Sequence, residues 1–272
     1  MEVGSKTDIG KRKSLNEDSY GCLFCSVDGE ERGVFIVADG VGGEDRGEVA
    51  SRIAVESIVN DIRPLITKEE EPTEEDIKKL VTSAVSKANK NILDYTEENS
   101  QAKMATTVTM AVIMGGYMTI ANVGDSRTYL ADDDRLDLIT KDHSLLQHLY
   151  EQGELTEDDI STPRSDKAKM QEHVVTQVLG DKQEIDVDTF QKYIYEGNKI
   201  LLCCDGLTDL VSDEDIKEVI DSSESMQSSC SKLVEMANDE GGKDNITVIL
   251  VNPTDLPDQE RVKGAETIFL ED

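Results

Sequence analysis

The chain has no tryptophan, and aromatic residues make up only 4% of its 272 positions. Hydrophobic residues still account for 37% of the chain, which is enough for a sizeable core packed mainly by aliphatic side chains. No run approaches the roughly 18 apolar residues that a membrane-spanning helix needs. The start, Met1-Glu2-Val3-Gly4, also lacks the basic and apolar stretches of a signal peptide. We therefore expect neither a membrane anchor nor export.

Basic residues are scarce as well. The chain has 28 Lys and Arg against 58 Asp and Glu, which gives a formal net charge of -30. Such a surface repels nucleic acid and anionic lipid, because binding to either begins with the neutralisation of phosphates. We therefore expect no nucleic-acid or membrane partner. A phosphorylated substrate would be repelled too, so chemistry on phosphate would need a local source of positive charge, such as bound cations.

The five cysteines are an odd number and indicate reduced thiols in a cytoplasmic protein. Cys22 and Cys25 have the spacing of a redox or zinc half-motif. No second pair of Cys or His follows at a useful distance, and both residues lie in a strand-like run. We interpret them, and the Cys203-Cys204 pair in another strand, as structural.

Apolar periodicity predicts strands and helices without a linker or an internal repeat. Residues 19–27 and 33–38 are predicted as strands around a turn at 28–31. An apolar stripe predicts a helix over about 46–63, and Thr73 is the expected N-cap of a second, longer helix. Further strands are predicted at 105–114, 117–123, 127–130, 136–139, 186–194, 199–204 and 245–251, and two helices within about 213–239. Blocks of strands separated by paired helices favour a layered α+β fold over a doubly wound one.

Three apolar runs each carry an aspartate at one end. Asp39 follows Val34-Phe35-Ile36-Val37-Ala38, Asp205 follows Ile200 to Cys204, and Asp244 precedes Asn245 to Val251. A carboxylate at the end of a buried strand is partly desolvated, and several that converge repel one another. Hard divalent cations, which prefer oxygen ligands, would resolve both problems. Any one Asp-Gly pair could instead be an ordinary turn, but three such strand ends together favour a metal site.

Short motifs around these positions follow one another along nearly the whole chain, from about Thr7 to Val251. They are Asp8-Ile9-Gly10, Asn16-Glu17-Asp18-Ser19, Val37 to Gly43, Ala105-Thr106-Thr107, Asn122 to Arg127, Thr140 to Ser144, Leu179-Gly180, Cys204 to Asp209 and Asp244 to Thr247. In this order and spacing the sequence resembles the metal-dependent serine/threonine phosphatases of the PP2C family, of the bacterial or archaeal type. The resemblance implies two antiparallel sheets packed face to face as a central β-sandwich, flanked by helices, with a metal site at one end.

The resemblance also implies roles for individual residues. Asp39 would bridge two Mn or Mg ions, with the Gly40 carbonyl on one ion and Asp205 and Asp244 on the other. Asp39, Asp205 and Asp244 would thus be the catalytic residues, acting through a metal-bound water that attacks phosphorus in line. Others would complete the set of metal-binding residues: Glu17 and Asp18 through water, and Asp125 and Asp209, with Asp205, at a third, weaker ion.

This sequence departs from the family pattern at two positions. Many relatives have a histidine, a candidate general acid, directly after the Asp-Gly pair, where this chain has Val41. The family also places a phosphate-binding arginine five residues before the Asp of its Asn-Glu-Asp motif, and here that count from Asp18 falls on Lys13. Arg12 is the alternative. Lysine is a point charge that lacks the bidentate fork of arginine, so the identity of the phosphate-binding residue stays open between the two.

The resemblance assigns residues 1–254 to the phosphatase domain, 144–179 to a flap that varies in the family, and 255–272 to a tail. His143, at the start of the flap, is interpreted as structural. The expected substrates are phosphorylated proteins, with a cognate Ser/Thr kinase as a further partner, and we expect a monomer.

Four alternatives were weighed. A catalytically weak binding module with the same fold, a pseudophosphatase, is disfavoured because Asp39, Asp205 and Asp244 are intact. Asp186-Val187-Asp188-Thr189 superficially resembles the nucleophile motif of haloacid-dehalogenase phosphatases, but Phe190 does not fit it and no parallel-sheet pattern surrounds it. Gly241-Gly242-Lys243 lacks the upstream glycine of a P-loop. A structural calcium buffer would need an EF-hand loop, which is absent from the sequence.

Overall fold

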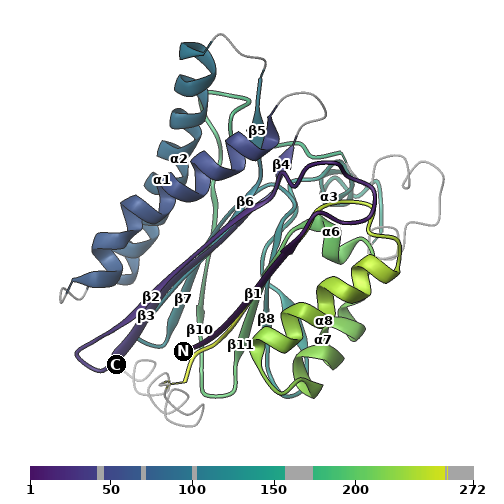
Figure 1. Ribbon diagram of the computed structural model, residues 1–272. Helices are drawn as coiled ribbons and strands as arrows, with labels where there is room; N and C mark the ends of the chain where they lie inside the picture. Colours follow the sequence, from purple (N-terminus) through teal and green to yellow (C-terminus); the bar gives the residue numbers. More distant parts are fainter. Residues whose placement is uncertain (42–45, 69–71, 100–102, 157–173, 255, 257–272) are drawn as a thin grey trace.

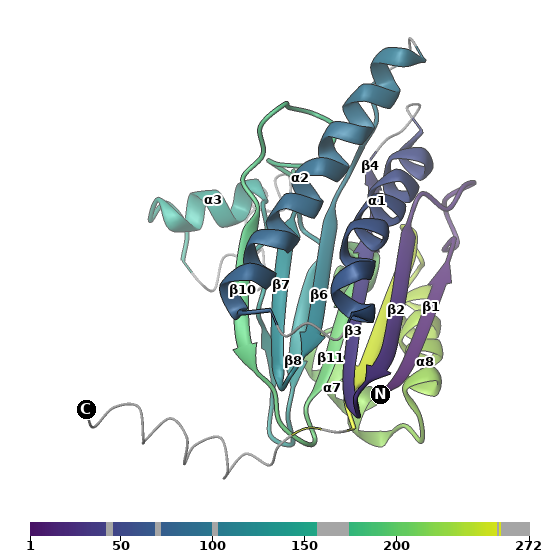
Figure 2. The ribbon, with the colours of Figure 1, turned by 90° about the vertical axis from the view of Figure 1, so that its left-hand side faces the viewer.

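Two five-stranded antiparallel sheets, packed face to face, form the centre of the protein (Figure 1). The structure is a computed structural model that describes residues 1–41, 46–68, 72–99, 103–156, 174–254 and 256. Helices cover the outer faces of both sheets (Figure 2). The predicted α+β fold with a central β-sandwich is therefore confirmed.

The first sheet has the order β10-β7-β6-β3-β2 and the second the order β1-β12-β11-β8-β9, with a small pair, β4 and β5, beside them. The strands of the first sheet are β2 Ser19–Val27, β3 Glu30–Ala38, β6 Val108–Met114, β7 Tyr117–Val123 and β10 Asp188–Tyr193. Those of the second sheet are β1 Glu2–Asp8, β8 Arg127–Ala131, β9 Leu136–Leu138, β11 Lys199–Cys203 and β12 Ile246–Asn252. The small pair consists of β4 Gly40–Val41 and β5 Ala105–Thr106. Because β10 runs antiparallel to β7, the parallel sheet of a haloacid-dehalogenase phosphatase is not found at Asp188.

The first sheet is covered by α1 Gly47–Thr67 and α2 Glu74–Glu98, and the second by α7 Asp213–Ser222 and α8 Met226–Asp239. Two shorter helices, α3 Leu145–Glu151 and α6 Asp205–Thr208, lie in the connections. Thr73 caps α2 as predicted: its Oγ1 accepts from the Asp76 backbone N–H at 3.2 Å, and Asp76 accepts in return from the Thr73 N–H. This reciprocal pairing satisfies two donors that a helix start leaves open.

Mainly aliphatic residues fill the three interfaces between the layers, as the shortage of aromatics required. Between the sheets lie Phe35, Ile120 and Ile249, among others, all fully buried. Separate clusters join α1 and α2 to the first sheet and α7 and α8 to the second. The largest fully buried side chains are mostly isoleucine and methionine.

Two predicted boundaries were wrong. The turn expected at 28–31 is only Asp28-Gly29, because both residues are left-handed (φ 52° and 89°) and such a two-residue turn lets the strands pair up to it. Helix α1 was predicted to end near 63 but continues through Pro64 to Thr67. Ile66 in this last turn is fully buried, and we infer that its packing outweighs the hydrogen bond that Pro64 cannot donate.

Strand β1 was not predicted, because Glu2–Asp8 has a single large apolar residue and alternates weakly. It forms an edge of the second sheet by pairing with β12 over its whole length. Gly4 lies against the start of α8, where a Cβ atom would collide with the backbone of Met226. The strand matters for function because the loop that follows it, from Ile9 to Asp18, reaches the same end of the sandwich as the predicted metal site (Figure 1).

Parts of two predicted segments lie outside the described residues: 157–173 of the flap, and the tail 255–272 except Leu256. Leu256 packs against the cluster between the sheets. Among the helices that the structure describes, none has both the length and the apolar character to cross a bilayer.

Candidate functional site

The antiparallel topology brings the predicted carboxylates to one end of the sandwich. Asp39 directly follows β3, Asp125 comes two residues after β7, and Asp205 two residues after β11. Asp244 comes two residues before β12, which pairs antiparallel with β11, so the end of β11 and the start of β12 meet. Residues far apart in the sequence therefore converge because the strand ends that carry them converge.

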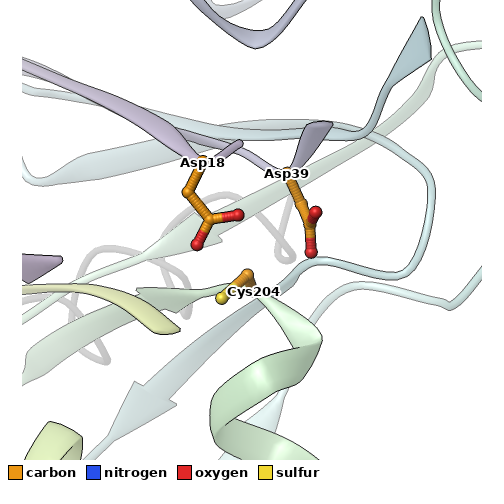
Figure 3. A group of neighbouring side chains, drawn as sticks. All are labelled: Asp18, Asp39 and Cys204. Atoms are coloured by element: carbon orange, nitrogen blue, oxygen red, sulfur yellow. The ribbon is translucent and has the colours of Figure 1, made fainter. Parts of the chain in front are cut away.

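At the centre of the site, a carboxylate oxygen of Asp18, one of Asp39 and the sulfur of Cys204 all lie within 4.8 Å of one another (Figure 3). The Asp39 and Asp205 carboxyl groups are also close enough to share a hydrogen bond. Cys204 was interpreted from the sequence as part of a strand, and its place beside the aspartates was missed. The available signal was its position immediately before Asp205.

The backbone around Asp39 is held by two threonines. The Asp39 carbonyl accepts from the Thr107 N–H and from the Thr106 hydroxyl, each at 2.8 Å, and the Asp39 N–H donates to Thr107 Oγ1 at 3.1 Å. Thr107 Oγ1 is itself 2.7 Å from Ser126 Oγ, next to Asp125. These buried contacts fix the direction of the Asp39 side chain. Both threonines lie in a motif that sequence analysis quoted without assigning them a role.

Asn245 links three parts of the site. Its backbone N–H donates to Asp244 Oδ1 at 2.7 Å, and its side-chain Oδ1 accepts from the Glu17 N–H at 2.9 Å. Its Nδ2 donates to the carbonyls of Ile9 and Leu15, each at 3.0 Å. Asn245, which is only 2% exposed, therefore connects Asp244 to the loop that runs from Ile9 to Asp18. In the sequence, Asn245 stands out only as part of the motif from Asp244 to Thr247.

Two glycines allow the close backbone packing of this region. A Cβ atom on Gly40 would collide with the backbone of Gly47 and with the carbonyl of Glu17. A Cβ atom on Gly206 would collide with the carbonyl of Asn245. The glycine after each of these two aspartates is therefore required sterically, so that its backbone can pass against a neighbouring segment.

The carboxylates destabilise one another's charged forms. Burial, followed by the charges of Asp18 and Asp205, raises the pKa of Asp39 well above its ordinary value. Burial also raises the pKa of Asp18 to about 7, although Thr247 donates to its Oδ2 at 2.6 Å. Burial and the charge of Asp205 raise the pKa of Asp125 to about 8. In each case desolvation comes first and carboxylate repulsion adds to it.

The site fits a hard divalent cation on its own chemistry. Asp18 Oδ1 is buried and has no hydrogen-bond donor among the described residues, although an oxygen in that position ordinarily requires one. Burial raises the pKa of the Cys204 thiol well above its ordinary value, so Cys204 stays a neutral thiol rather than a soft thiolate ligand. The remaining donors are carboxylate and carbonyl oxygens, the set that Mg and Mn prefer.

Glu17 and Asp209 lie at the margins of this cluster. Burial raises the pKa of Glu17, while the charge of Lys13 and the Gly47 N–H, which donates to Glu17 Oε1 at 3.2 Å, partly offset it. Asp209 is exposed and lies one helical turn beyond Asp205, whose carbonyl accepts from its N–H at 2.8 Å. Its charge is close enough to contribute to the raised pKa of Asp125.

Lys13 lies at the site, and its neighbour Arg12 is placed differently. The Lys13 ammonium is 2.6 Å from Asp244 Oδ1. Burial by itself would lower the pKa of Lys13, but its hydrogen bond to Asp244 and the surrounding carboxylates raise it. Arg12 is exposed and makes no ion pair within the described part of the chain. Both residues lie in the irregular connection between β1 and β2, so strand alternation does not decide which of the two faces the site.

His143 joins three segments, as expected of a structural histidine. Its Nδ1 accepts from the Gly124 N–H at 3.2 Å and from Gln177 Nε2 at 2.9 Å, and its Nε2 is 3.2 Å from Asp188 Oδ2. The Thr176 N–H donates to the His143 carbonyl at 2.7 Å. The two ends of the predicted flap are thus joined to each other and to the loop that carries Asp125.

Comparison with known proteins identifies relatives over nearly the whole length of the chain. The family model for protein phosphatase 2C matches residues 10–250. The serine/threonine phosphatase stp of Listeria innocua is 34% identical over 256 residues, which cover 92% of this chain and 95% of that protein. The protein phosphatase PhpP of Streptococcus pneumoniae is 30% identical over 252 residues, or 93% of this chain and 97% of the relative.

Solved structures show the same fold. The serine/threonine phosphatase of S. agalactiae has a TM-score of 0.80 at 29% identity, over 92% of this chain and 98% of that one. The catalytic domain of the serine/threonine phosphatase PstP, solved in complex with two manganese ions, has a TM-score of 0.74 at 30% identity, over 93% of this chain and 98% of that one.

The carboxylate cluster predicts an unusual pH dependence of stability in the metal-free protein. Because the folded-state pKa values of Asp18 and Asp125 lie above the ordinary carboxyl value, protonation stabilises the fold at low pH, and this stabilisation is lost as pH rises through about 7 to 8. In EDTA, the Tm should fall by a few degrees between pH 6 and pH 9. Asp125→Asn should reduce this fall, and the exposed control Asp133→Asn should not. If the Tm of the two variants fell equally with pH, repulsion within the carboxylate cluster would not be the cause of the fall.

Proposed function

Because the chain belongs to the protein phosphatase 2C family and is a protein serine/threonine phosphatase, we propose that it hydrolyses phosphoserine and phosphothreonine with two Mn or Mg ions bound by its carboxylate cluster. The observation that carries the proposal is that carboxylate oxygens of Asp18 and Asp39 lie within 4.8 Å of each other, while Asp18 Oδ1 is buried without a hydrogen-bond partner among the described residues. Residues 1–254 would form the catalytic unit, which agrees with the family match over 10–250.

The proposed ligands are those that the resemblance to the family implies, and the meeting of the carboxylate-bearing strand ends supports them. Asp39 would bridge the two ions, the Gly40 carbonyl would bind one, and Asp205 and Asp244 the other. Two further pairs complete the proposed set: Glu17 and Asp18 through water, and Asp125 and Asp209, with Asp205, at a weaker third ion. When bound, such cations supply the Lewis acidity that makes water a nucleophile near neutral pH and the positive charge that stabilises the phosphoryl transition state.

The protein's own residues position these groups and the substrate. Thr106 and Thr107 hold Asp39 in place, and Asn245 sets Asp244 relative to Glu17. Lys13, a cation beside Asp244, would bind an oxygen of the substrate phosphate. Val41 carries no proton to donate, so the proton for the leaving oxygen must come from another group.

The substrates imply a further partner. Phosphoserine and phosphothreonine in proteins are produced by kinases, so the proposal includes a Ser/Thr kinase that acts on the same proteins. The alternative, a pseudophosphatase that only binds, is disfavoured because the proposed ligand positions keep their carboxylates and these lie at one end of the sandwich.

Metal removal should abolish activity. We expect exhaustive chelation to stop the hydrolysis of a phosphothreonine peptide, and Mn to restore it better than Ca, because the larger Ca prefers more ligands and activates water less. The measurement is phosphate release at matched free-metal concentrations. Full activity after chelation would contradict the two-metal proposal.

Removal of one ligand charge should separate catalysis from folding. Asp39→Asn and Asp205→Asn keep the size of the side chain but remove a charged ligand, so kcat should fall by roughly a hundredfold to a thousandfold while the fold persists. Asp125→Asn should act more mildly, mainly by raising the metal concentration needed. Circular dichroism and Tm serve as the control for folding. A loss of stability that accounts for the loss of activity would instead indicate a structural role.

Lys13 and Arg12 can be distinguished by substitution. Lys13→Ala should raise KM for a phosphopeptide by roughly tenfold, with a smaller effect on kcat, because it removes one charge-assisted hydrogen bond to phosphate. Lys13→Arg should retain most of the affinity. Arg12→Ala, the matched control, should leave KM within about twofold. The reverse pattern would assign phosphate binding to Arg12.

A further inference from the structure

Three aliphatic side chains are exposed around the carboxylate cluster. Leu15 is 49% exposed, Val41 41% and Ile9 39%. Single exposed aliphatic residues are common on protein surfaces and need no explanation. These three, however, belong to the two segments that supply Asp18, Glu17, Asp39 and Gly40 to the site.

Hydrogen bonds join the backbones of the segments that carry these three residues. The carbonyls of Ile9 and Leu15 both accept from Asn245 Nδ2 at 3.0 Å, so their backbones lie close together although five residues separate them. The Gly40 N–H donates to the Glu17 carbonyl at 3.2 Å, which places Val41 beside the same loop. Figure 1 shows this loop running past β4 at one end of the sandwich. We call Ile9, Leu15 and Val41 the aliphatic rim.

The rim residues belong to the segments that would hold the substrate phosphate under the proposed function. Asp39 is two residues from Val41, and the Lys13 ammonium, 2.6 Å from Asp244, belongs to the loop between Ile9 and Leu15. An extended peptide advances by about 3.3 Å per residue. With its phosphoresidue at Asp39 and Lys13, we expect the residues one or two positions away to lie within reach of the rim.

We propose that the aliphatic rim binds aliphatic side chains that flank the phosphorylated residue, and so selects substrates by their local sequence. This inference rests on the proposed function and adds the class of substrate. The net charge of -30 repels acidic flanking residues and attracts basic ones, but the rim side chains themselves offer only apolar contacts, which salt does not weaken as it weakens charged ones. Burial of the exposed part of one leucine side chain is sufficient for a several-fold preference.

The test compares two phosphothreonine peptides of equal length and charge. One has Leu or Val at the two positions on each side of the phosphothreonine, and the other has Ser or Asn there. With Mn, the wild-type protein should hydrolyse the aliphatic peptide with a kcat/KM roughly fivefold higher, mainly through KM. Leu15→Asn and Val41→Thr, which nearly conserve side-chain size, should each reduce this ratio to about twofold or less.

Leu138→Asn is the matched control, because Leu138 is similarly exposed (42%) but lies on β9, at the edge of the second sheet. It should keep the wild-type ratio and the wild-type rate on p-nitrophenyl phosphate. Each rate is divided by the same variant's rate on p-nitrophenyl phosphate, so a partly unfolded variant cannot imitate a change in selectivity. Equal kcat/KM for the two peptides in the wild type would overturn the role of the rim but leave the proposed function intact. Absence of hydrolysis of either peptide with Mn would overturn the proposed function itself.

Discussion

The repulsion among carboxylates gathered at one end of the sandwich is the constraint on which the rest of this structure depends. Asp18, Asp39 and Asp125 are close enough to other carboxylates that the charged form of each is disfavoured by its neighbours as well as by burial. Such a group of like charges cannot contribute to stability by itself. The fold must therefore hold it in place with other interactions, and a bound cation is the natural means of neutralising it.

The layers of the protein provide that support. Three aliphatic clusters hold the sheets and helices together along their whole length, while the strand ends carry the polar groups. Buried hydroxyls and one buried amide then fix the carboxylate-bearing loops: Thr107 at Asp39 and Asn245 at Asp244. Such contacts are short and directional, so they can hold side chains within the tolerances that a catalytic site requires. The residues that stabilise the fold and the residues that form the site thus lie in different parts of the same strands.

Much of this arrangement could be predicted from the sequence. The strands that end in Asp39 and Asp205 are strongly apolar, so both the strands and the unusual position of the acids are visible in a linear pattern. Strand β1 was missed because an edge strand with one large apolar residue carries little periodic signal, and its pairing with β12 comes from 240 residues away in the chain. Cys204, Thr107 and Asn245 were missed as site residues for a related reason. Their roles depend on contacts between distant segments, and their residue types are common in strands and turns.

The placement of Lys13 shows how a strongly acidic protein can attract a phosphate. At long range, 58 acidic side chains oppose the approach of any anion, although salt at physiological ionic strength largely screens this repulsion beyond about 8–10 Å. At short range the nearby charges decide the electrostatic potential, and the Lys13 ammonium together with the proposed cations would make it positive at the site. Contacts that do not depend on charge, such as those of an aliphatic rim, add affinity without adding positive charge to the surface. The phosphate of a substrate is therefore expected to be recognised at short range, because the net charge of the protein opposes the approach of an anion from a distance.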